Sequence, residues 1–147
     1  MFLHELGWND FFQQYWESRA DDGLHPARIV EAQKDAYRIV AETGEMAAEV
    51  TGRFRHVALD NAAFPAVGDW VAARLEPSAG KALIHEVLPR RTKLSRQTAG
   101  ERAAMEQVLV TNVDVAFIVM SLNSDFSPRR VERYLGVIWE RDRKSVV

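Results

Sequence analysis

The strongest constraint on the fold is a series of five short segments, rich in Val, Ile, Ala and Tyr, between residues 27 and 88. Turn-forming residues separate these segments, which is typical of a small all-β sandwich or barrel. One long connection, residues 52–67, joins the third segment to the fourth. This layout favours an OB-type barrel, and an SH3-like barrel is the alternative that the periodicity leaves open. The expected strands are residues 27–32, 37–41, 46–51, 69–75 and 82–88.

A short amphipathic helix is expected ahead of the barrel, over residues 9–16. An asparagine at its start is a suitable N-cap, and Phe12, Tyr15 and Trp16 recur at helical spacing. This aromatic stripe either packs on the domain that follows, which we favour, or forms a face for a binding partner. Residues 21–26, which are acidic and contain Gly and Pro, indicate a linker.

The pattern changes again after the barrel. Residues 113–120 are nearly continuous apolar sequence with β-branched side chains, as expected for a strand buried on both faces of a parallel sheet. Ser127 and Pro128 supply an N-cap and a first helical position for a helix that runs to about Glu140. Residues 144–147 resemble the start of another strand, so we expect the chain to end in mid-element, one step into a β-α-β unit.

Positive charge is concentrated in one part of the chain. The net charge of −2 argues against a uniformly basic nucleic-acid binder. Immediately after the last expected strand, however, four cations occur within seven residues: Arg90, Arg91, Lys93 and Arg96. Such a cluster neutralises phosphates and releases counterions with little sequence preference. We favour RNA contact over a solvated linker because the adjacent barrel is a common nucleic-acid platform.

A second basic group lies in the long connection. Arg53 and Arg55 flank Phe54, which either stacks on a base while the arginines hold the backbone or plugs the core between solvent-facing arginines. The sequence does not separate these two interpretations.

A cation in the first turn of a helix opposes the helix dipole and suggests an external anion. Three weaker indicators of this kind lie near the start of the last helix: Arg129, Arg130 and Arg133.

The sequence holds no recognisable active site. It contains no cysteine, and its four histidines are too widely spaced to place two metal ligands on one helical face. Gly80-Lys81 comes nearest to a phosphate-binding loop, but Leu75 stands where the leading glycine is required and Ala82 where Ser or Thr is required. We therefore expect no catalytic residue, no metal site and no GTP-binding residue in this chain. The longest apolar run is far shorter than the ~20 residues of a membrane span, so a cytoplasmic protein is expected.

Several stretches, taken in order from about residue 26 onward, resemble one family. They are Ala-Glu-Val-Thr-Gly-Arg-Phe-Arg (48–55), Ala-Val-Gly-Asp-Trp-Val (66–71), Ile-His-Glu-Val-Leu-Pro-Arg-Arg-Thr-Lys-Leu-Ser-Arg (84–96), Glu-Gln-Val-Leu-Val-Thr-Asn-Val-Asp (106–114), Phe-Ile-Val-Met-Ser-Leu-Asn-Ser-Asp-Phe (117–126) and Arg-Arg-Val-Glu-Arg-Tyr-Leu (129–135). The ordered set resembles the circularly permuted bacterial GTPases that depend on the small ribosomal subunit, the RsgA/YjeQ type.

The resemblance implies an N-terminal OB domain, a central GTPase domain with permuted motifs and a C-terminal zinc domain. Proteins of this type bind the small (30S) ribosomal subunit late in its maturation, contact 16S rRNA partly through the OB barrel and hydrolyse GTP. GTP, Mg and Zn are thus implied for a full-length parent. In this chain no cofactor is expected, because the guanine-recognising Asn-Lys-x-Asp would lie just beyond Val147.

On this basis the chain is interpreted as an N-terminal fragment of a ribosome-biogenesis GTPase, a monomer without membrane contact. Its predicted fold is mostly β with α: a five-stranded OB-fold barrel, preceded by a short helix and followed by an incomplete β-α portion of a G domain. The predicted units are residues 1–25 (helix and linker), 26–96 (OB-fold RNA-binding domain) and 97–147 (truncated start of the GTPase domain). The predicted RNA-binding residues are Arg53, Phe54, Arg55, Arg90, Arg91, Lys93 and Arg96.

Two alternatives stay open. One is a stand-alone OB module that binds single-stranded nucleic acid or a protein partner independently of ribosomes. The other is a fragment without function, whose terminal β-α segment cannot bury the apolar residues 113–120.

Overall fold

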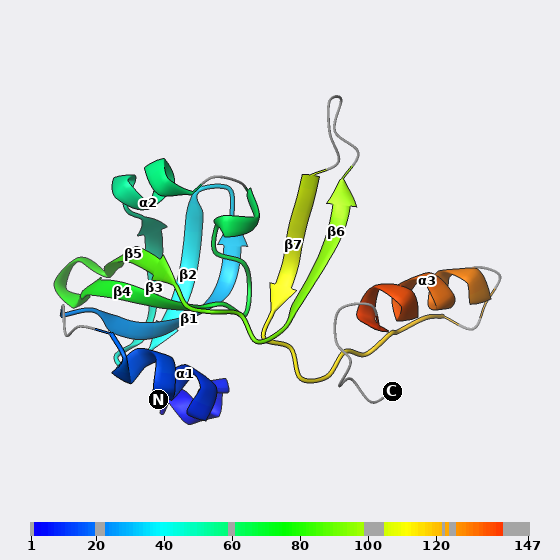
Figure 1. The fold of residues 1–147 in the computed structure, drawn as a ribbon, viewed down its shortest axis with the longest axis horizontal. Coiled ribbons are helices and arrows are strands. Elements are labelled where there is room, and N and C mark those ends of the chain that lie inside the picture. Colours follow the sequence, from blue (N-terminus) through cyan, green and yellow to red (C-terminus); the bar gives the residue numbers. More distant parts are fainter. Residues whose placement is uncertain are drawn as a thin grey trace.

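A computed structural model describes residues 2–19, 23–58, 61–98, 105–121, 123 and 126–139 of the chain. Five strands close into a barrel in the order β1-β2-β3-β5-β4 (Figure 1). All neighbouring pairs are antiparallel except β3 and β5, which run parallel. The strands are β1 His25–Gln33, β2 Ala36–Ala41, β3 Gly44–Val50, β4 Trp70–Glu76 and β5 Lys81–Val87. Each lies within two residues of its predicted bounds, which confirms the expected barrel of OB type.

The long connection between β3 and β4 contains helix α2 (Gly52–Val57), where the sequence predicts no helix. The Thr51 hydroxyl oxygen caps α2 by accepting a hydrogen bond from the Phe54 N–H at 3.1 Å. Six residues are too few to show a helical period, so the pattern along the chain does not reveal this element. Two 3-10 helices complete the barrel connections: η2 (Asn61–Ala63) before β4 and η3 (Pro77–Ala79) between β4 and β5.

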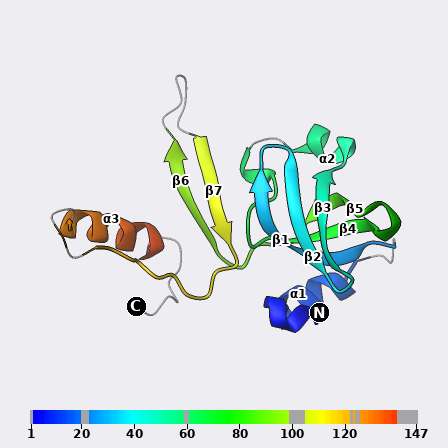
Figure 2. The same ribbon diagram turned by 180° about the vertical axis from the view of Figure 1, so that it is seen from behind.

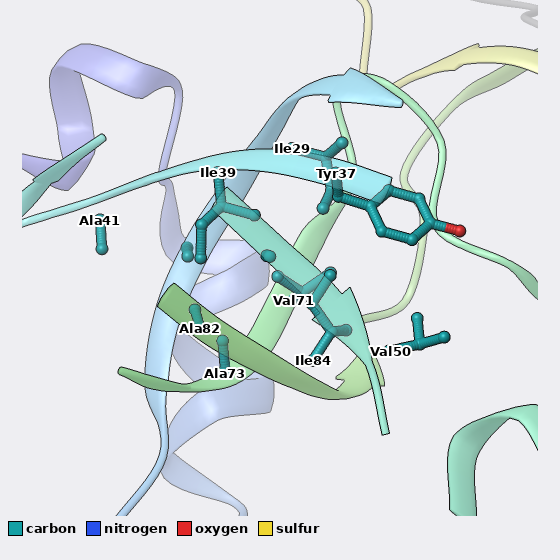
Figure 3. Close-up of a cluster of buried hydrophobic side chains, with 11 residues drawn as sticks. Ile29, Tyr37, Ile39, Ala41, Val50, Val71, Ala73, Ala82 and Ile84 are labelled. Atoms are coloured by element: carbon teal, nitrogen blue, oxygen red, sulfur yellow. The ribbon is translucent and has the colours of Figure 1, made fainter. Parts of the chain in front are cut away.

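The barrel interior is filled by alternate residues of its strands (Figure 3). Ile29, Ile39 and Ile84 are no more than 1% exposed, and small residues such as Ala73 and Ala82 fill the space between them. Burying one isoleucine side chain stabilises a fold by about 1.5–3 kcal/mol, so this cluster is the main source of barrel stability.

Helix α1 (Asp10–Glu17) covers the outer face of β4, together with the 3-10 helix η1 (Leu3–Leu6). The Asn9 side chain caps α1, as predicted. Phe12 is 1% exposed and packs with Trp8 around Trp70, whose ring centroid lies 4.7 Å from that of Trp8 in an edge-to-face arrangement. The predicted packing of the aromatic stripe on the following domain is confirmed.

A two-stranded antiparallel hairpin follows the barrel: β6 (Lys93–Thr98) and β7 (Met105–Thr111). Figures 1 and 2 show it beside the barrel, joined to it at one end. The sequence does not reveal this hairpin, because the cations of β6 conceal its alternation. The predicted boundary between residues 96 and 97 falls within β6, so the hairpin crosses it.

Residues 113–121 form no strand, and this prediction is wrong. Val115, Phe117 and Val119 are 66%, 87% and 88% exposed. A strand buried on both faces needs neighbouring strands, and none of the strands in the described ranges pairs with this segment.

Helix α3 (Pro128–Trp139) begins at the predicted proline. It packs beside β6, where Ile138 lines a small cavity with Leu94 and Val115. The predicted strand at residues 144–147 lies outside the described residues. No described helix has the length and apolar character required to cross a bilayer.

Candidate nucleic-acid interface

Arg90 is held inside the barrel domain and not at its surface. Its Nε and Nη2 donate to the two carboxylate oxygens of Asp69 at 2.9 and 2.7 Å. Its Nη1 and Nη2 also donate to the carbonyl oxygens of Ala62 and Phe64, at 2.7 and 2.9 Å. Because Asp69 is fully buried, Arg90 neutralises a carboxylate that the fold has removed from water. Arg90, one of the predicted RNA-binding residues, therefore has a structural role in the barrel.

The other three cations of the cluster, Arg91, Lys93 and Arg96, lie on or just before β6 and are called the hairpin cations below. Each contacts a polar side chain of β7 or of the segment after it: Asp114, Glu106 and Gln107, respectively. The Lys93 Nζ is 3.0 Å from its carboxylate, and the Arg96 Nε is 2.9 Å from its amide oxygen. The side chains of Arg91 and Lys93 remain 39% and 38% exposed, so a ligand can reach them without unfolding.

The second basic group divides between core and surface. Phe54 packs against the barrel core, with its ring centroid 5.8 Å from that of Phe64 in an edge-to-face contact. This placement supports the interpretation of Phe54 as a core plug. Arg55 forms an ion pair with Asp35 at 3.1 Å, and Arg53 is exposed on α2. Asp35, the partner of Arg55, lines one cavity of about 530 Å³ with Glu106 and Gln107, the partners of Lys93 and Arg96. The turn between β1 and β2 therefore lies between the two basic groups.

The outward face of β1–β3 is acidic. Arg38 lies between two glutamates, with its Nε 3.4 Å from Glu31 and its Nη1 2.8 Å from Glu45. Hydrogen bonding to Glu45 raises the pKa of Arg38. Glu42 and Glu49 are also exposed on this part of the barrel. OB barrels commonly bind nucleic acid on this face, but here its carboxylates would repel phosphate.

The hairpin is anchored to the barrel at Gly68. Gly68 has a φ of +91°, and a Cβ atom there would lie 2.0 Å from the carbonyl oxygen of Thr111 at the end of β7. The Thr111 N–H donates to the Val67 carbonyl at 2.9 Å, and the Asn112 side-chain amide donates to the Gly68 carbonyl at 3.0 Å. Only glycine permits this close approach, so residue 68 fixes where the hairpin meets the barrel.

Arg28 joins three parts of the molecule. Its guanidinium donates to the Leu6 carbonyl of η1 and, at 3.1 Å, to the Asn112 carbonyl after β7, while it lies 5.7 Å from the ring centre of Trp70. Burial lowers the pKa of Arg28, and the charge of Asp114 opposes this shift. Sequence reasoning missed Arg28 because an arginine in a strand carries no signal of its partners.

Among the described residues, the arrangement offers charge and hydrogen-bonding groups. In the described part of the chain, no three His, Asp or Glu side chains gather as they would around a metal ion. The arginines of α3 are exposed, and the Arg133 guanidinium lies 5.7 Å from the ring centre of its neighbour Tyr134.

Comparison with known sequences identifies the family. The sequence model of the RsgA GTPase family matches residues 87–147. Small ribosomal subunit biogenesis GTPase RsgA of Opitutus terrae is 46% identical over 155 residues, covering 100% of this chain and 42% of that protein. The RsgA protein of Syntrophotalea carbinolica is 40% identical, covering 95% of this chain and 40% of its own length. The chain thus spans about two fifths of the length of these relatives.

Solved structures show the same fold. The crystal structure of YloQ, a circularly permuted GTPase, superposes with a TM-score of 0.55 at 22% identity, covering 85% of this chain and 40% of that one. YjeQ from Thermotoga maritima gives a TM-score of 0.55 at 21% identity, covering 81% of this chain and 38% of its own. These similarities show the fold, whereas the identities of the sequence relatives show the family. The chain belongs to the RsgA GTPase family.

Proposed function

We propose that this chain binds the small ribosomal subunit through 16S rRNA, as part of a ribosome-biogenesis GTPase that works in the cytoplasm. The observation that carries the proposal is the row of hairpin cations on an accessible strand of an RsgA-family chain. Their contact is with phosphates, so it positions the protein on RNA and reads little sequence.

The present partners of the hairpin cations do not prevent this contact. An ion pair between exposed side chains is worth about 0–1 kcal/mol, because water and salt screen it. A phosphate is a stronger acceptor for a guanidinium or ammonium group, and its binding releases counterions. Exchange of Asp114, whose side chain is 69% exposed, for a phosphate therefore costs little. Glu106 is more shielded, at 26% exposed, and also accepts a hydrogen bond from the Ser95 hydroxyl.

Guanine nucleotide is not proposed as a ligand of these 147 residues. The sequence holds neither a phosphate-binding loop nor an Asn-Lys-x-Asp segment, and both are needed to hold GTP in proteins of this type. Isothermal titration of the chain with GTP and Mg²⁺ should release no binding heat. Saturable uptake in that titration would contradict this part of the proposal.

Cosedimentation with purified small subunits tests the binding proposal. The unmodified chain should pellet with subunits at low salt and much less at high salt. The triple variant Arg91→Ala, Lys93→Ala, Arg96→Ala should lose most of the low-salt association. The matched control is Arg129→Ala, Arg130→Ala, Arg133→Ala, which removes the same charge from α3 and should pellet nearly as the unmodified chain does. Equal pelleting of both triple variants would refute the role of the hairpin.

A further inference from the structure

A groove of about 800 Å³ runs between α2 and β5, on a surface of the barrel that includes none of the hairpin cations. Its lining includes three apolar residues, Phe54, Val57 and Val87, which are called the floor below, and two polar residues, Arg53 and His85, which are called the rim. The Val57 side chain is 67% exposed, so a ligand in the groove can contact it.

His85 lies at an irregularity of β5. Ala72 pairs with Glu86 and Ala73 pairs with Ile84, so His85 is the extra residue of a β-bulge. Its neighbour Ile84 is fully buried, whereas His85 is exposed. Bulges are frequent beside binding sites, and His85 lies among the residues that line the groove.

The charge of the rim suits an anion more than an apolar peptide. Arg53 has no ion-pair partner among the described residues, unlike Arg55 on the same helix. The carboxylate of Glu86 in the groove wall is already held by Arg19 at 3.1 Å and by the Tyr15 hydroxyl at 2.5 Å. The groove therefore combines an apolar floor with a rim on which Arg53 and His85 are the groups left to meet a ligand.

We propose that this groove takes an unstacked base of single-stranded RNA, with the adjoining phosphate between Arg53 and His85. The proposal rests on the RNA-binding function proposed above and gives it a second contact, distinct from the hairpin. A planar base matches an apolar floor because every base has a π-face, and the rim supplies the phosphate contacts. The Thr51 hydroxyl, whose oxygen accepts from α2, has its proton available for a base edge.

Binding of a fluorescent oligouridine of about 12 nucleotides, compared with an RNA duplex of equal length, tests this inference. The full chain should prefer the single strand. Val57→Glu and the double variant Arg53→Ala, His85→Ala should each weaken single-strand binding about tenfold, since a stacked base contributes strongly to affinity. Arg74→Ala removes an exposed arginine of β4 outside the groove and serves as the control, with little expected effect.

A crosslink gives an independent measurement. An oligouridine carrying 4-thiouridine should attach to peptides that contain residues 51–57 or His85. Unchanged affinity of both groove variants, or crosslinks confined to the hairpin, would overturn the groove while leaving subunit binding by the hairpin cations intact. Failure of the proposed function is a different result, namely no cosedimentation of the unmodified chain with subunits. Thermal unfolding of each variant verifies that the fold is retained.

Discussion

Arg90 holds Asp69 through a two-point ion pair, with Nε 2.9 Å from Oδ1 and Nη2 2.7 Å from Oδ2. The carboxylate is fully buried and the arginine side chain is 16% exposed. The pair connects the entry of β4 to the chain that leaves β5, so it closes the barrel where the hairpin begins.

Arg90→Ala should lower the free energy of unfolding by about 3–5 kcal/mol, because it leaves a buried carboxylate without its partner. Arg91→Ala, one residue away, removes an exposed pair and should lower it by about 0–1 kcal/mol. Urea unfolding followed by tryptophan fluorescence measures both. Equal losses for the two variants would mean that the burial of Asp69 has no energetic consequence.

Gly68→Ala should destabilise the chain by about 2–4 kcal/mol, since the new Cβ combines a strained positive φ with an overlap of the Thr111 carbonyl. Gly80→Ala is the matched control, because Gly80 has a φ of +62° but open space around its Cβ position. It should cost only the backbone strain of about 1–2 kcal/mol. The difference between the two melting temperatures isolates the overlap, and no difference would contradict the close approach of hairpin and barrel.

Asn112→Gly should loosen the hairpin while keeping the backbone conformation. Asn112 has a φ of +53°, which glycine adopts freely, but its side chain also accepts from the Arg91 N–H at 2.8 Å and donates to Gly68. Losing these contacts should speed amide hydrogen exchange at Arg91 and cost about 1–3 kcal/mol. Asp35→Gly replaces the other described non-glycine residue with positive φ, in an exposed turn. It removes the exposed ion pair with Arg55 and should cost only about 0–1 kcal/mol. Similar exchange rates in both variants would count against the bridging role of Asn112.

Tyr15→Phe should lower stability by about 1 kcal/mol near pH 8, because it removes the hydrogen bond to Glu86. That hydrogen bond is the largest of three effects that raise the pKa of Tyr15 above its ordinary value. The other two are burial of the hydroxyl and the negative charge of Glu86. A raised pKa means that the contribution is complete below about pH 10, the ordinary value, and is lost as the pH rises through the folded-state pKa. The stability difference between the two proteins should therefore shrink above about pH 10 in urea titrations. If the difference in unfolding free energy between the two proteins stayed constant above about pH 10, the Tyr15 hydroxyl would not gain stability from this hydrogen bond in the way described.

The barrel was predictable from sequence because its strands alternate in and out of one core. Ile39 and Ile84, for example, occupy inward positions in segments that end at clear turn residues. The apolar segment 113–120 carries an equally strong signal, yet Phe117 and Val119 are exposed. An apolar run predicts a buried strand, but burial also requires neighbouring strands on both sides. Those strands come from other parts of the chain, so the segment itself does not reveal whether they are present.

The candidate site was predictable only as a cluster of charge. Arg90 and Arg91 are adjacent residues of the same type. The sequence cannot show that Arg90 pairs with the buried Asp69 while Arg91 pairs with the exposed Asp114. Gly68 and Asn112 belong to stretches that carry the family resemblance, and their roles become clear only when β7 is placed against the barrel. Composition and periodicity do not reveal contacts between side chains that are far apart in the sequence.

The salt dependence of binding to small subunits tests the central claim most directly. Filter binding of the unmodified chain, from about 50 to about 200 mM salt, should give a linear fall of log K with log salt concentration. Removing the three hairpin cations should reduce the steepness of that line by about two to three units, which is about 0.7–0.9 for each lost phosphate contact. An unchanged slope in the triple variant would contradict the account, because it would show that Arg91, Lys93 and Arg96 neutralise no phosphate.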